Sequence, residues 1–183
     1  APLRFLLSAG SAFMNAQVVN ASKPVVKING DWTKPLVGKS VVVTGAARGI
    51  GLAISQVLAR DGAKVIGIDI PQAEAELASA MASINGLSLP LDITSDGACE
   101  VLVKFCLDHG NTLHSIVHNA GITRDKMLSR MTSVQWDLLM QVNLGAAQRI
   151  NDALLATELL DNGGKIIGVA SISGIAGNVG QTN

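Results

Sequence analysis

Apolar residues follow two alternating patterns from Gly38 onward. Short β-branched runs predict strands at about 40–44, 64–69, 86–91, 112–118 and 164–170. Between them, apolar residues three or four positions apart predict helices at about 50–61, 71–84, 95–109 and 133–161, the last with a bend near Gly145. Strands that alternate with helices in this way indicate a parallel sheet with crossover helices.

Right-handed crossovers turn this pattern into a specific fold class. They predict an α/β, doubly wound parallel sheet of the Rossmann type, with strand order 3-2-1-4-5. Residues 1–35 do not fit the alternation, because residues 2–9 look like the end of a helix and residues 17–19 like a short strand. A turn is expected at Asn29-Gly30. We therefore predict the end of a preceding domain over 1–22, a linker over 23–37 and a dinucleotide-binding domain over 38–183.

The first predicted strand runs into a glycine-rich turn and then a helix, in residues 44–51 (TGAARGIG). The start of a helix presents unpaired N–H groups and a positive dipole end, and glycines let a phosphate approach the backbone closely. This order of elements predicts a pyrophosphate site. The residues expected to contact the cofactor here are Gly45, Arg48, Gly49, Ile50 and Gly51.

The second strand ends in a carboxylate, Asp69, which follows Gly51 by 18 residues. The acid that binds the adenosine ribose lies about 20 residues beyond such a motif. A carboxylate there accepts hydrogen bonds from the ribose hydroxyls of NAD and repels the 2′-phosphate of NADP. Arg48 could attract that phosphate, but the strand-end charge is expected to dominate, so NAD (NADH) is predicted over NADP. The alternative role for Asp69 is a helix N-cap before Pro71.

Two further strand ends carry polar residues at the same edge. Asp92, followed by Ile93, could accept from the adenine amino group or could simply stabilise a turn. After the fourth strand, Asn119 is expected to tie neighbouring strands together, and Ala120 and Gly121 to leave room for the cofactor. His118, just before them, is expected to pack beside the strand. Three suitable strand ends at one edge strengthen the cofactor prediction.

Composition narrows the function further. The chain has 14 basic and 14 acidic residues, three Phe, two Trp and no Tyr. Nucleic-acid binding needs a basic surface or stacking aromatics, so that class is excluded. Cys99 and Cys106 fit no common zinc spacing and are expected to be small buried residues, which favours a reducing, cytoplasmic setting without a metal. No apolar run reaches the length of a membrane span, and polar residues interrupt the apolar start at 4–9, so no signal peptide is predicted.

Taken together, these motifs resemble the short-chain dehydrogenase/reductase family. The likeness runs from about Gly38 to the last residue. Residues 119–128 (NAGITRDKML) and 174–183 (GIAGNVGQTN) are most similar to its 3-oxoacyl-[acyl-carrier-protein] reductase branch. Residues 5–13 and 17–19 resemble the closing helix and strand of the same fold. That is the arrangement of the high-molecular-weight reductases, in which a degenerate Rossmann-like copy precedes the active one, and we expect residues 1–22 to end such a copy.

The resemblance also implies catalytic residues. Asn143 is expected to hold a water of a proton relay, helped by a local break in helix bonding. Ser171 is expected to hydrogen-bond the substrate carbonyl, with Ser173 as its rival. The family's tyrosine and lysine would lie beyond Asn183, so the chain is expected to be truncated before Tyr-x-x-x-Lys. Because a general acid contributes typically 10²–10⁴-fold, this piece alone is expected to transfer hydride very slowly.

The implied activity is NADH-dependent reduction of 3-oxoacyl thioesters, on acyl carrier protein or coenzyme A, in fatty-acid metabolism. Alternatives are another short-chain alcohol or hydroxysteroid dehydrogenase, or a non-catalytic NAD-binding module. Arg124, Lys126 and Arg130 form either a solvated basic face or a receptor for the carrier protein. The long predicted helix resembles the one that this family pairs across a dimer, so a homo-oligomer (dimer or tetramer) is expected, without nucleic-acid or membrane partners.

Overall fold

A computed structural model describes residues 33–110 and 112–181. The chain divides into two units, 1–32 and 33–183, and the second contains all of the described residues. The predicted end of a preceding domain over 1–22, and residues 23–32 of the predicted linker, lie outside the described residues. The last linker residues, 33–37, form a turn in which Leu36 donates its N–H to the carbonyl of Asp61 at 2.9 Å. Leu36 also packs against the apolar core.

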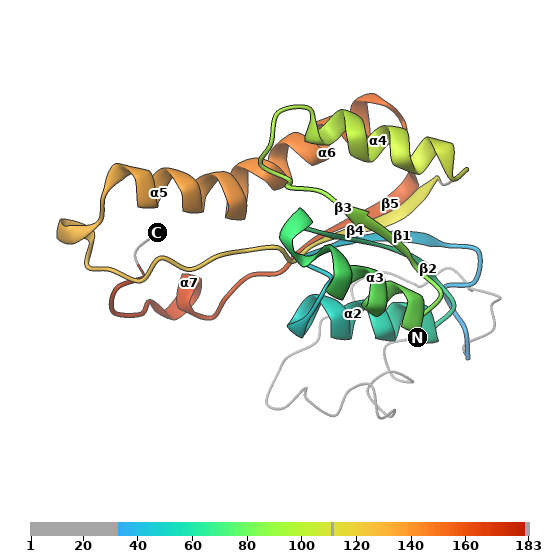
Figure 1. The fold of residues 1–183 in the computed structure, drawn as a ribbon, viewed down its shortest axis with the longest axis horizontal. Helices are drawn as coiled ribbons and strands as arrows, with labels where there is room; N and C mark the ends of the chain where they lie inside the picture. Colours follow the sequence, from blue (N-terminus) through green and yellow to red (C-terminus); the bar gives the residue numbers. More distant parts are fainter. Residues whose placement is uncertain (1–32, 111, 182–183) are drawn as a thin grey trace, which may run out of the picture. The chain divides into compact units, whose positions relative to one another are not determined.

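Five parallel strands form the sheet, in the order β3-β2-β1-β4-β5 (Figure 1). This is the predicted order and confirms the Rossmann-type α/β fold. All five residues of the central strand β1 are buried, because helices cover both faces of the sheet. The bounds are β1 (Ser40–Thr44), β2 (Lys64–Asp69), β3 (Leu87–Pro90), β4 (Leu113–His118) and β5 (Leu160–Gly168).

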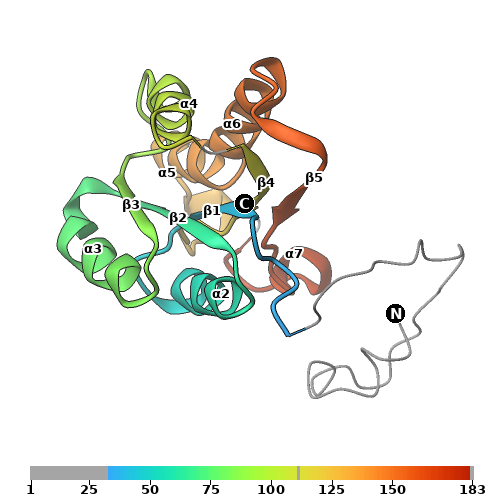
Figure 2. The same ribbon diagram turned by 90° about the vertical axis from the view of Figure 1, so that its right-hand side faces the viewer.

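The helices lie in two layers, one on each face of the sheet (Figure 2). One layer holds α2 (Gly49–Arg60) and α3 (Glu74–Ser83), with a short 3₁₀ turn, Pro71–Ala73, before α3. The other holds α4 (Ala98–Asp108) and α6 (Ala146–Ala156). Side chains of β1 alternate between the layers, as the period of a strand requires. Val42 belongs to the core beneath α4 and α6, whereas Val41 and Val43 belong to the core beneath α2 and α3.

The helix predicted over 133–161 is divided into three parts. They are α5 (Ser133–Met140), a π-helical turn (Gln141–Gly145) and α6, so the bend expected near Gly145 is a π-helical turn. Thr132 and Gln135 form a capping box that starts α5. The helix ends at Ala156, five residues before the predicted limit. Glu158 then takes a left-handed conformation (φ 51°), which a helix cannot continue.

Strand β5 starts earlier and ends earlier than predicted, at Leu160–Gly168 instead of 164–170. Its pairing with β4 shifts register between Leu113 and Ser115, because Leu113 pairs with Leu160 and Ser115 with Lys165. The intervening residues of β5 bulge out around Gly163, whose φ is +83°. A bulge has no apolar alternation, so the pattern indicated only the second half of this strand.

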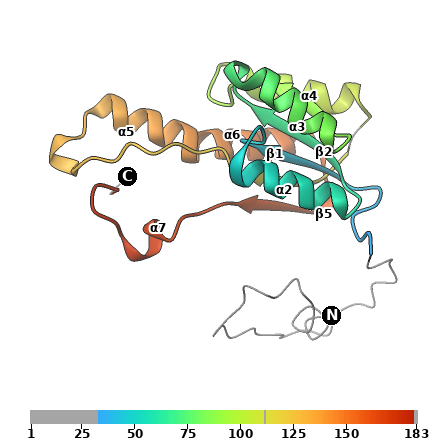
Figure 3. The ribbon, with the colours of Figure 1, turned by 60° about the horizontal axis from the view of Figure 1, so that its bottom comes forward.

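Beyond the carboxyl edge of the sheet, α5 and the segment that carries α7 (Ser173–Ala176) extend from the layers (Figures 1 and 3). The loop between β4 and α5 meets this last segment, since Lys126 donates its N–H to the carbonyl of Gly180 at 2.8 Å. A 3₁₀ turn, Leu128–Arg130, lies in the same loop. No helix in the described part of the chain combines the length and apolarity needed to cross a membrane.

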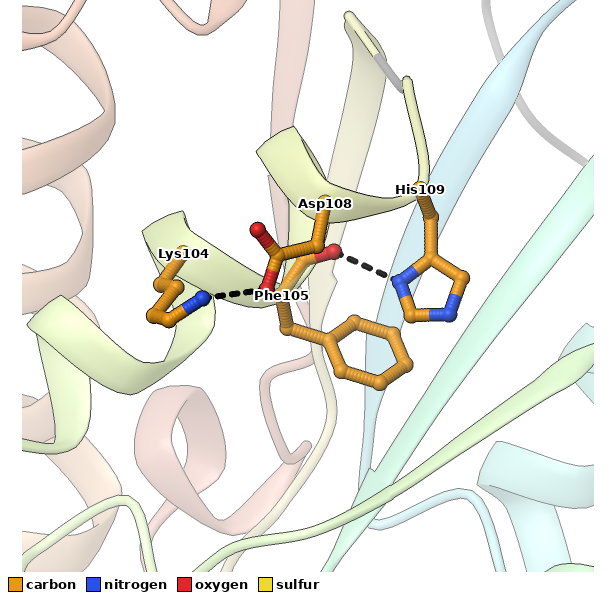
Figure 4. Close-up of polar contacts among 4 residues, drawn as sticks. All are labelled: Lys104, Phe105, Asp108 and His109. Carbon is orange, nitrogen blue, oxygen red and sulfur yellow. Dashed lines mark hydrogen bonds and ion pairs between the residues drawn. The ribbon is translucent and has the colours of Figure 1, made fainter.

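Away from the carboxyl ends of the strands, the end of α4 carries local capping contacts. At the end of α4, His109 donates from Nδ1 to the carbonyl of Phe105 at 2.8 Å (Figure 4). Its ring lies against the Phe105 ring, with the centroids 4.2 Å apart and the planes tilted by 33°. Lys104 forms an exposed ion pair with Asp108 one turn along the helix. Exposed pairs of this kind stabilise a helix by only a few tenths of a kcal/mol, about 0.3–0.5. His109 is therefore a capping residue.

Candidate functional site

The carboxyl ends of the strands surround two adjoining cavities. The first, of about 910 Å³, is lined by the ends of β1, β4 and β5 and by the π-helical turn. The second, of about 390 Å³, is lined by the glycine-rich turn and the ends of β2 and β3. Residues 119–122 line both cavities and form their common wall. The predicted site residues that line at least one cavity are Gly45, Arg48, Ile50, Asp69, Asp92, Ile93, Asn119, Ala120, Gly121, Asn143 and Ser171.

Two glycines of the turn are required by close packing. A Cβ on Gly51 would lie 1.9 Å from the carbonyl oxygen of Gly45, so no side chain fits there. Gly45 has φ +68°, and its Cβ would lie 3.0 Å from Cα of Ala120. The turn, the start of α2 and the end of β4 are thus packed backbone against backbone. Gly49 differs: its φ is +58°, but no described atom lies within 4 Å of the place of its Cβ. The surface above Gly49 is therefore open.

The start of α2 has the free donors that the prediction requires. Arg48 occupies the N-cap position in an extended conformation and makes no side-chain capping hydrogen bond. The first N–H groups of an α-helix have no partner within the helix. Ile50, in this first turn, is exposed and lines the first cavity. The N–H groups of the first turn remain available to an anion at the cavity edge.

Asp69 connects β2 to the glycine-rich turn. Its Oδ2 accepts from the N–H of Ala47 at 2.9 Å, and its Oδ1 accepts from the N–H of Ile70 at 2.9 Å. The following 3₁₀ turn has Ile70 as its N-cap, without a side-chain capping bond. The alternative role of Asp69 as a helix cap is therefore wrong. A carboxylate has about four acceptor positions, so both oxygens can still accept from hydroxyl groups in the second cavity.

Asp92 forms a turn at the edge of the same cavity. Its Oδ1 accepts from the N–H of Thr94 at 2.9 Å and from the Thr94 hydroxyl at 2.6 Å. The turn interpretation is therefore correct, and Asp92 still lines the second cavity beside Ile93. Its Oδ2 makes no hydrogen bond to any described residue, so a role toward a ligand stays a prediction.

Asn119 ties β4 to β1, as expected. Its Nδ2 donates to the carbonyls of Thr44 at 3.1 Å and Gly45 at 3.2 Å. The Thr44 hydroxyl in turn accepts from the N–H groups of Asn119 and Ala120, each at 3.0 Å. Sequence reasoning missed Thr44 as a residue that organises the site. The signal for it was a hydroxyl at the end of an otherwise apolar, buried strand.

Asn143 lies in the π-helical turn, so the predicted break in helix bonding is confirmed. Its Oδ1 accepts from the N–H of Ile122 at 2.8 Å, and its Nδ2 donates to the carbonyl of Ile122 at 2.9 Å. The Asn143 amide therefore holds the loop after Gly121 against the helix. A Cβ on Gly121 would make only ordinary contact with Asn143 Oδ1, at 3.4 Å. Space alone does not require glycine at position 121.

Ser171 follows β5 and lines the first cavity. Its Oγ accepts from the N–H of Ser173 at 3.2 Å, which leaves its own hydroxyl hydrogen free to donate. Ser173 starts α7 and lines a smaller neighbouring cavity of about 190 Å³, which Ser171 lines as well. Of the two serines, Ser171 is the one on the large cavity, together with Asn143.

His118 also faces the first cavity, where it is paired with Asn151 of α6. The distance from His118 Nε2 to Asn151 Oδ1 is 2.8 Å. Burial lowers the pKa of His118, and the hydrogen bond to Asn151 offsets part of this shift. The prediction that His118 packs beside the strand did not include its hydrogen bond to Asn151 or its place on the cavity lining. Asn151 is 33 positions away in the sequence, and no local pattern indicated the pair.

A parallel sheet whose carboxyl edge combines a glycine-rich turn, an open helix start and a strand-end carboxylate defines a dinucleotide-binding protein of the Rossmann class. The family model for short chain dehydrogenases matches residues 39–183, and the chain belongs to this family. The family resemblance seen in the sequence is confirmed.

Several curated relatives carry the name 3-oxoacyl-[acyl-carrier-protein] reductase FabG. The protein from Vibrio cholerae is 40% identical over 148 residues, which cover 81% of this chain and 61% of the relative. The protein from Escherichia coli is 40% identical over 147 residues (80% and 60%), and that from Pseudomonas aeruginosa 38% over 151 residues (81% and 61%). The chain thus spans about 61% of the length of the Vibrio cholerae relative.

Proposed function

We propose that the protein containing this chain is a nicotinamide-dependent reductase that converts 3-oxoacyl thioesters to 3-hydroxyacyl thioesters in fatty-acid metabolism. The proposal rests on one observation: the two cavities lie side by side and share residues 119–122 as lining. One cavity has the features of a dinucleotide site, and the other presents Ser171. The names of the relatives support a 3-oxoacyl thioester on acyl carrier protein as the substrate. Coenzyme A as an alternative carrier rests on the family resemblance alone.

The residues present fit the cofactor. Gly51 allows a backbone packing that any side chain would block, Gly45 has a left-handed φ of +68° that favours glycine, and the surface above Gly49 is open. A pyrophosphate at the start of α2 would accept from the free N–H groups there. Asp69 would accept from the adenosine ribose, Asp92 from the adenine amino group, and residues 119–121 would line the cofactor on its other side. When bound, the nicotinamide supplies a hydride to carbon 3 of the substrate.

The residues of the first cavity would then orient the substrate and move the proton. Ser171 donates its hydroxyl hydrogen to the 3-oxo oxygen and fixes the carbonyl in the cavity. Asn143 holds Ile122 through its side chain, and the π-helical turn alters the normal backbone bonding so that a water can be held there. The family resemblance implies a tyrosine and a lysine after Asn183, so the proposed turnover belongs to the whole protein. A cytoplasmic location and a homo-oligomeric state remain predictions from the sequence.

NADH is the proposed reductant because of the charge of Asp69. The carboxylate lines the second cavity, where it would repel a 2′-phosphate. Arg48 and Arg124 line the same cavity and would attract that phosphate. Asp69 is held by two backbone N–H groups, so its charge is fixed in place, and we expect it to decide the preference.

The test is the reduction of an acetoacetyl thioester by the whole protein, followed by the loss of reduced cofactor absorbance, with NADH and NADPH compared. We expect turnover with NADH and a lower KM for NADH than for NADPH. In Asp69→Ser the KM for NADH should rise at least about tenfold, because hydrogen bonds to a charged group contribute about 1.5–3 kcal/mol. The KM for NADPH should fall in the same variant.

Asp61→Ser is the matched control, since Asp61 lies at the far end of α2 and pairs with exposed Arg60. It should leave both KM values unchanged. An unaltered cofactor preference in Asp69→Ser would refute the ribose argument. No turnover of any 3-oxoacyl thioester would refute the substrate class and favour a different dehydrogenase or a non-catalytic module.

A further inference from the structure

Among the described residues that line the first cavity, one has a side chain of the type that titrates near neutral pH. That side chain is His118; the others are apolar residues, glycines, hydroxyl residues and asparagines. A reduction consumes one proton for each hydride. A cavity that houses such a reaction needs a route by which protons reach it from solvent, and His118 is the described lining residue with suitable chemistry.

The hydrogen bond to Asn151 sets the tautomer of the ring. The amide oxygen of Asn151 only accepts, so His118 Nε2, at 2.8 Å, carries a hydrogen. Nδ1 of the neutral ring then has a free lone pair. Among the described residues no hydrogen bond to Nδ1 is found, and the ring lines the first cavity. His118 therefore has one nitrogen fixed by Asn151 and one proton-accepting nitrogen without a partner among the described residues, on a ring that lines the first cavity.

No charged side chain faces His118 from the described elements packed around it. β5 places Gly168 opposite it in register, α6 contributes Asn151, and β1 ends in the Thr44 hydroxyl. The charged neighbours of Asn151 in sequence are directed elsewhere. Arg149 Nη2 is 3.5 Å from the carbonyl oxygen of Ile93 and lines another cavity. The charge of Asp152 instead contributes to the raised pKa of Cys99 in α4.

Burial therefore dominates the titration of the ring and lowers the pKa of His118. The pKa falls because removal from water disfavours the charged imidazolium, so the ring is neutral at neutral pH. An imidazolium formed there is a stronger acid than one in water. It gives its proton up readily, which suits a group that takes a proton from solvent and passes it on.

We propose that His118, oriented by Asn151, exchanges protons with the water of the first cavity and supplies the proton that each reduction consumes. This inference rests on the proposed function. A hydronium ion in the cavity water gives its proton to Nδ1, which leaves a neutral water and an imidazolium, while Nε2–H stays bonded to Asn151. Nδ1 then returns the proton to a cavity water on the way to the general acid. The ring ends in its starting tautomer, and no electrons are transferred.

The first test uses the whole protein with His118→Asn. Asparagine can still donate a hydrogen bond toward Asn151 but cannot titrate. We expect kcat for 3-oxoacyl thioester reduction to fall about tenfold at neutral pH, less than the 10²–10⁴-fold of a direct general acid. The KM values for NADH and thioester should not change. The solvent deuterium isotope effect on kcat should rise, and added imidazole should restore activity.

The second test has a readout that does not depend on activity. Asn151→Asp places a carboxylate beside the ring, which raises the pKa of His118. The NMR titration of the His118 ring should move to higher pH, and the acid limb of the kcat profile should move with it. Asn85→Asp is the control, because Asn85 lies in an exposed turn with φ 55°, a conformation that aspartate tolerates. It should leave the titration unchanged.

The outcomes separate this inference from the proposed function. If the wild type reduces 3-oxoacyl thioesters and His118→Asn keeps its kcat, isotope effect and pH profile, His118 is only a packing residue and the inference is wrong. Loss of NADH binding together with activity in His118→Asn would also overturn it, since the role would then be structural. A wild-type protein that binds NADH but reduces no 3-oxoacyl thioester overturns the proposed function, and this role with it.

Discussion

Single polar side chains hold the carboxyl edge of this sheet together. Thr44 is buried at the end of β1, and its hydroxyl accepts from two successive N–H groups of the segment after β4. Asn119 closes the same junction from the other side through two backbone carbonyls. A buried N–H without an acceptor costs about 1–3 kcal/mol. These contacts therefore fix the wall shared by the two cavities, where a cofactor and a substrate would meet.

The two cysteines lead to a prediction about reactivity. Cys106 is fully buried, and burial raises its pKa to about 11; Cys99 is half-buried, and its pKa is also raised, chiefly by burial. Only the thiolate reacts with alkylating agents. Iodoacetamide in the native state should modify Cys99 slowly, and Cys106 only after unfolding in guanidinium. Peptide mass mapping gives the order, and equal native rates at the two sites would contradict the core position of Cys106.

At the scale of the element, two glycines of the glycine-rich turn meet different requirements: one allows the protein to pack, and the other leaves space for a cofactor. Gly51 is needed by the protein itself, because its missing Cβ makes room for the Gly45 carbonyl. Gly49 meets no neighbouring atom and leaves space beside the start of α2. We infer that Gly49 serves the cofactor more than the fold. The two positions can therefore be distinguished by measuring stability and binding separately.

Substitutions at these two glycines test that separation. Gly51→Ala should lower the free energy of unfolding by about 1–3 kcal/mol, the usual cost of overpacking, and abolish NADH binding. Gly49→Asn should keep stability within about 1 kcal/mol, because asparagine tolerates the left-handed conformation. It should still weaken NADH binding, since its side chain enters the open space. Thermal unfolding and NADH fluorescence titration give the two readouts; unimpaired NADH binding by Gly49→Asn would place the pyrophosphate elsewhere.

At the scale of the whole molecule, charge is balanced overall but uneven locally. The sequence has no net charge, yet Arg124, Lys126 and Arg130 lie in the loop between β4 and α5. This loop is held to the segment after β5 by the contact of Lys126 with Gly180 and by a hydrogen bond from Gln181 to Asp125, at 3.0 Å. The basic group is therefore carried by a braced loop next to the first cavity, where an acidic carrier protein could dock.

The carrier-protein hypothesis makes its own prediction. In the whole protein, replacing Arg124 and Lys126 by alanine should raise KM for carrier-bound substrate severalfold, with little change for a short thioester, because only the carrier presents a large acidic surface. The effect should weaken as salt is added. Arg60→Ala, at the distant end of α2, is the control and should change neither KM. Equal effects on both substrates would mean that the basic group is a solvated face.

Much of this molecule could be predicted from local pattern. The bounds of β1 and β2 were predicted to the residue, and the strand order followed from the handedness of crossovers. The bend near Gly145 was also expected from glycine in a long helix, although not its π-helical form. The strand bounds and the bend depend on neighbours within a few positions, because apolar periodicity and turn residues act over one or two turns of chain. The strand order instead follows from the general right-handedness of parallel crossovers.

The contacts that build the site could not be derived in this way. Asp69 bonds a residue 22 positions away, Asn143 one that is 21 away, and His118 one that is 33 away. The start of β5 likewise depends on a register shift against β4. The sequence alone was enough to order the elements and to bring the right residue types to one edge. Which atoms meet there, and which nitrogen of His118 is held by Asn151, is decided only by the packing of strand ends and helices that are distant in sequence.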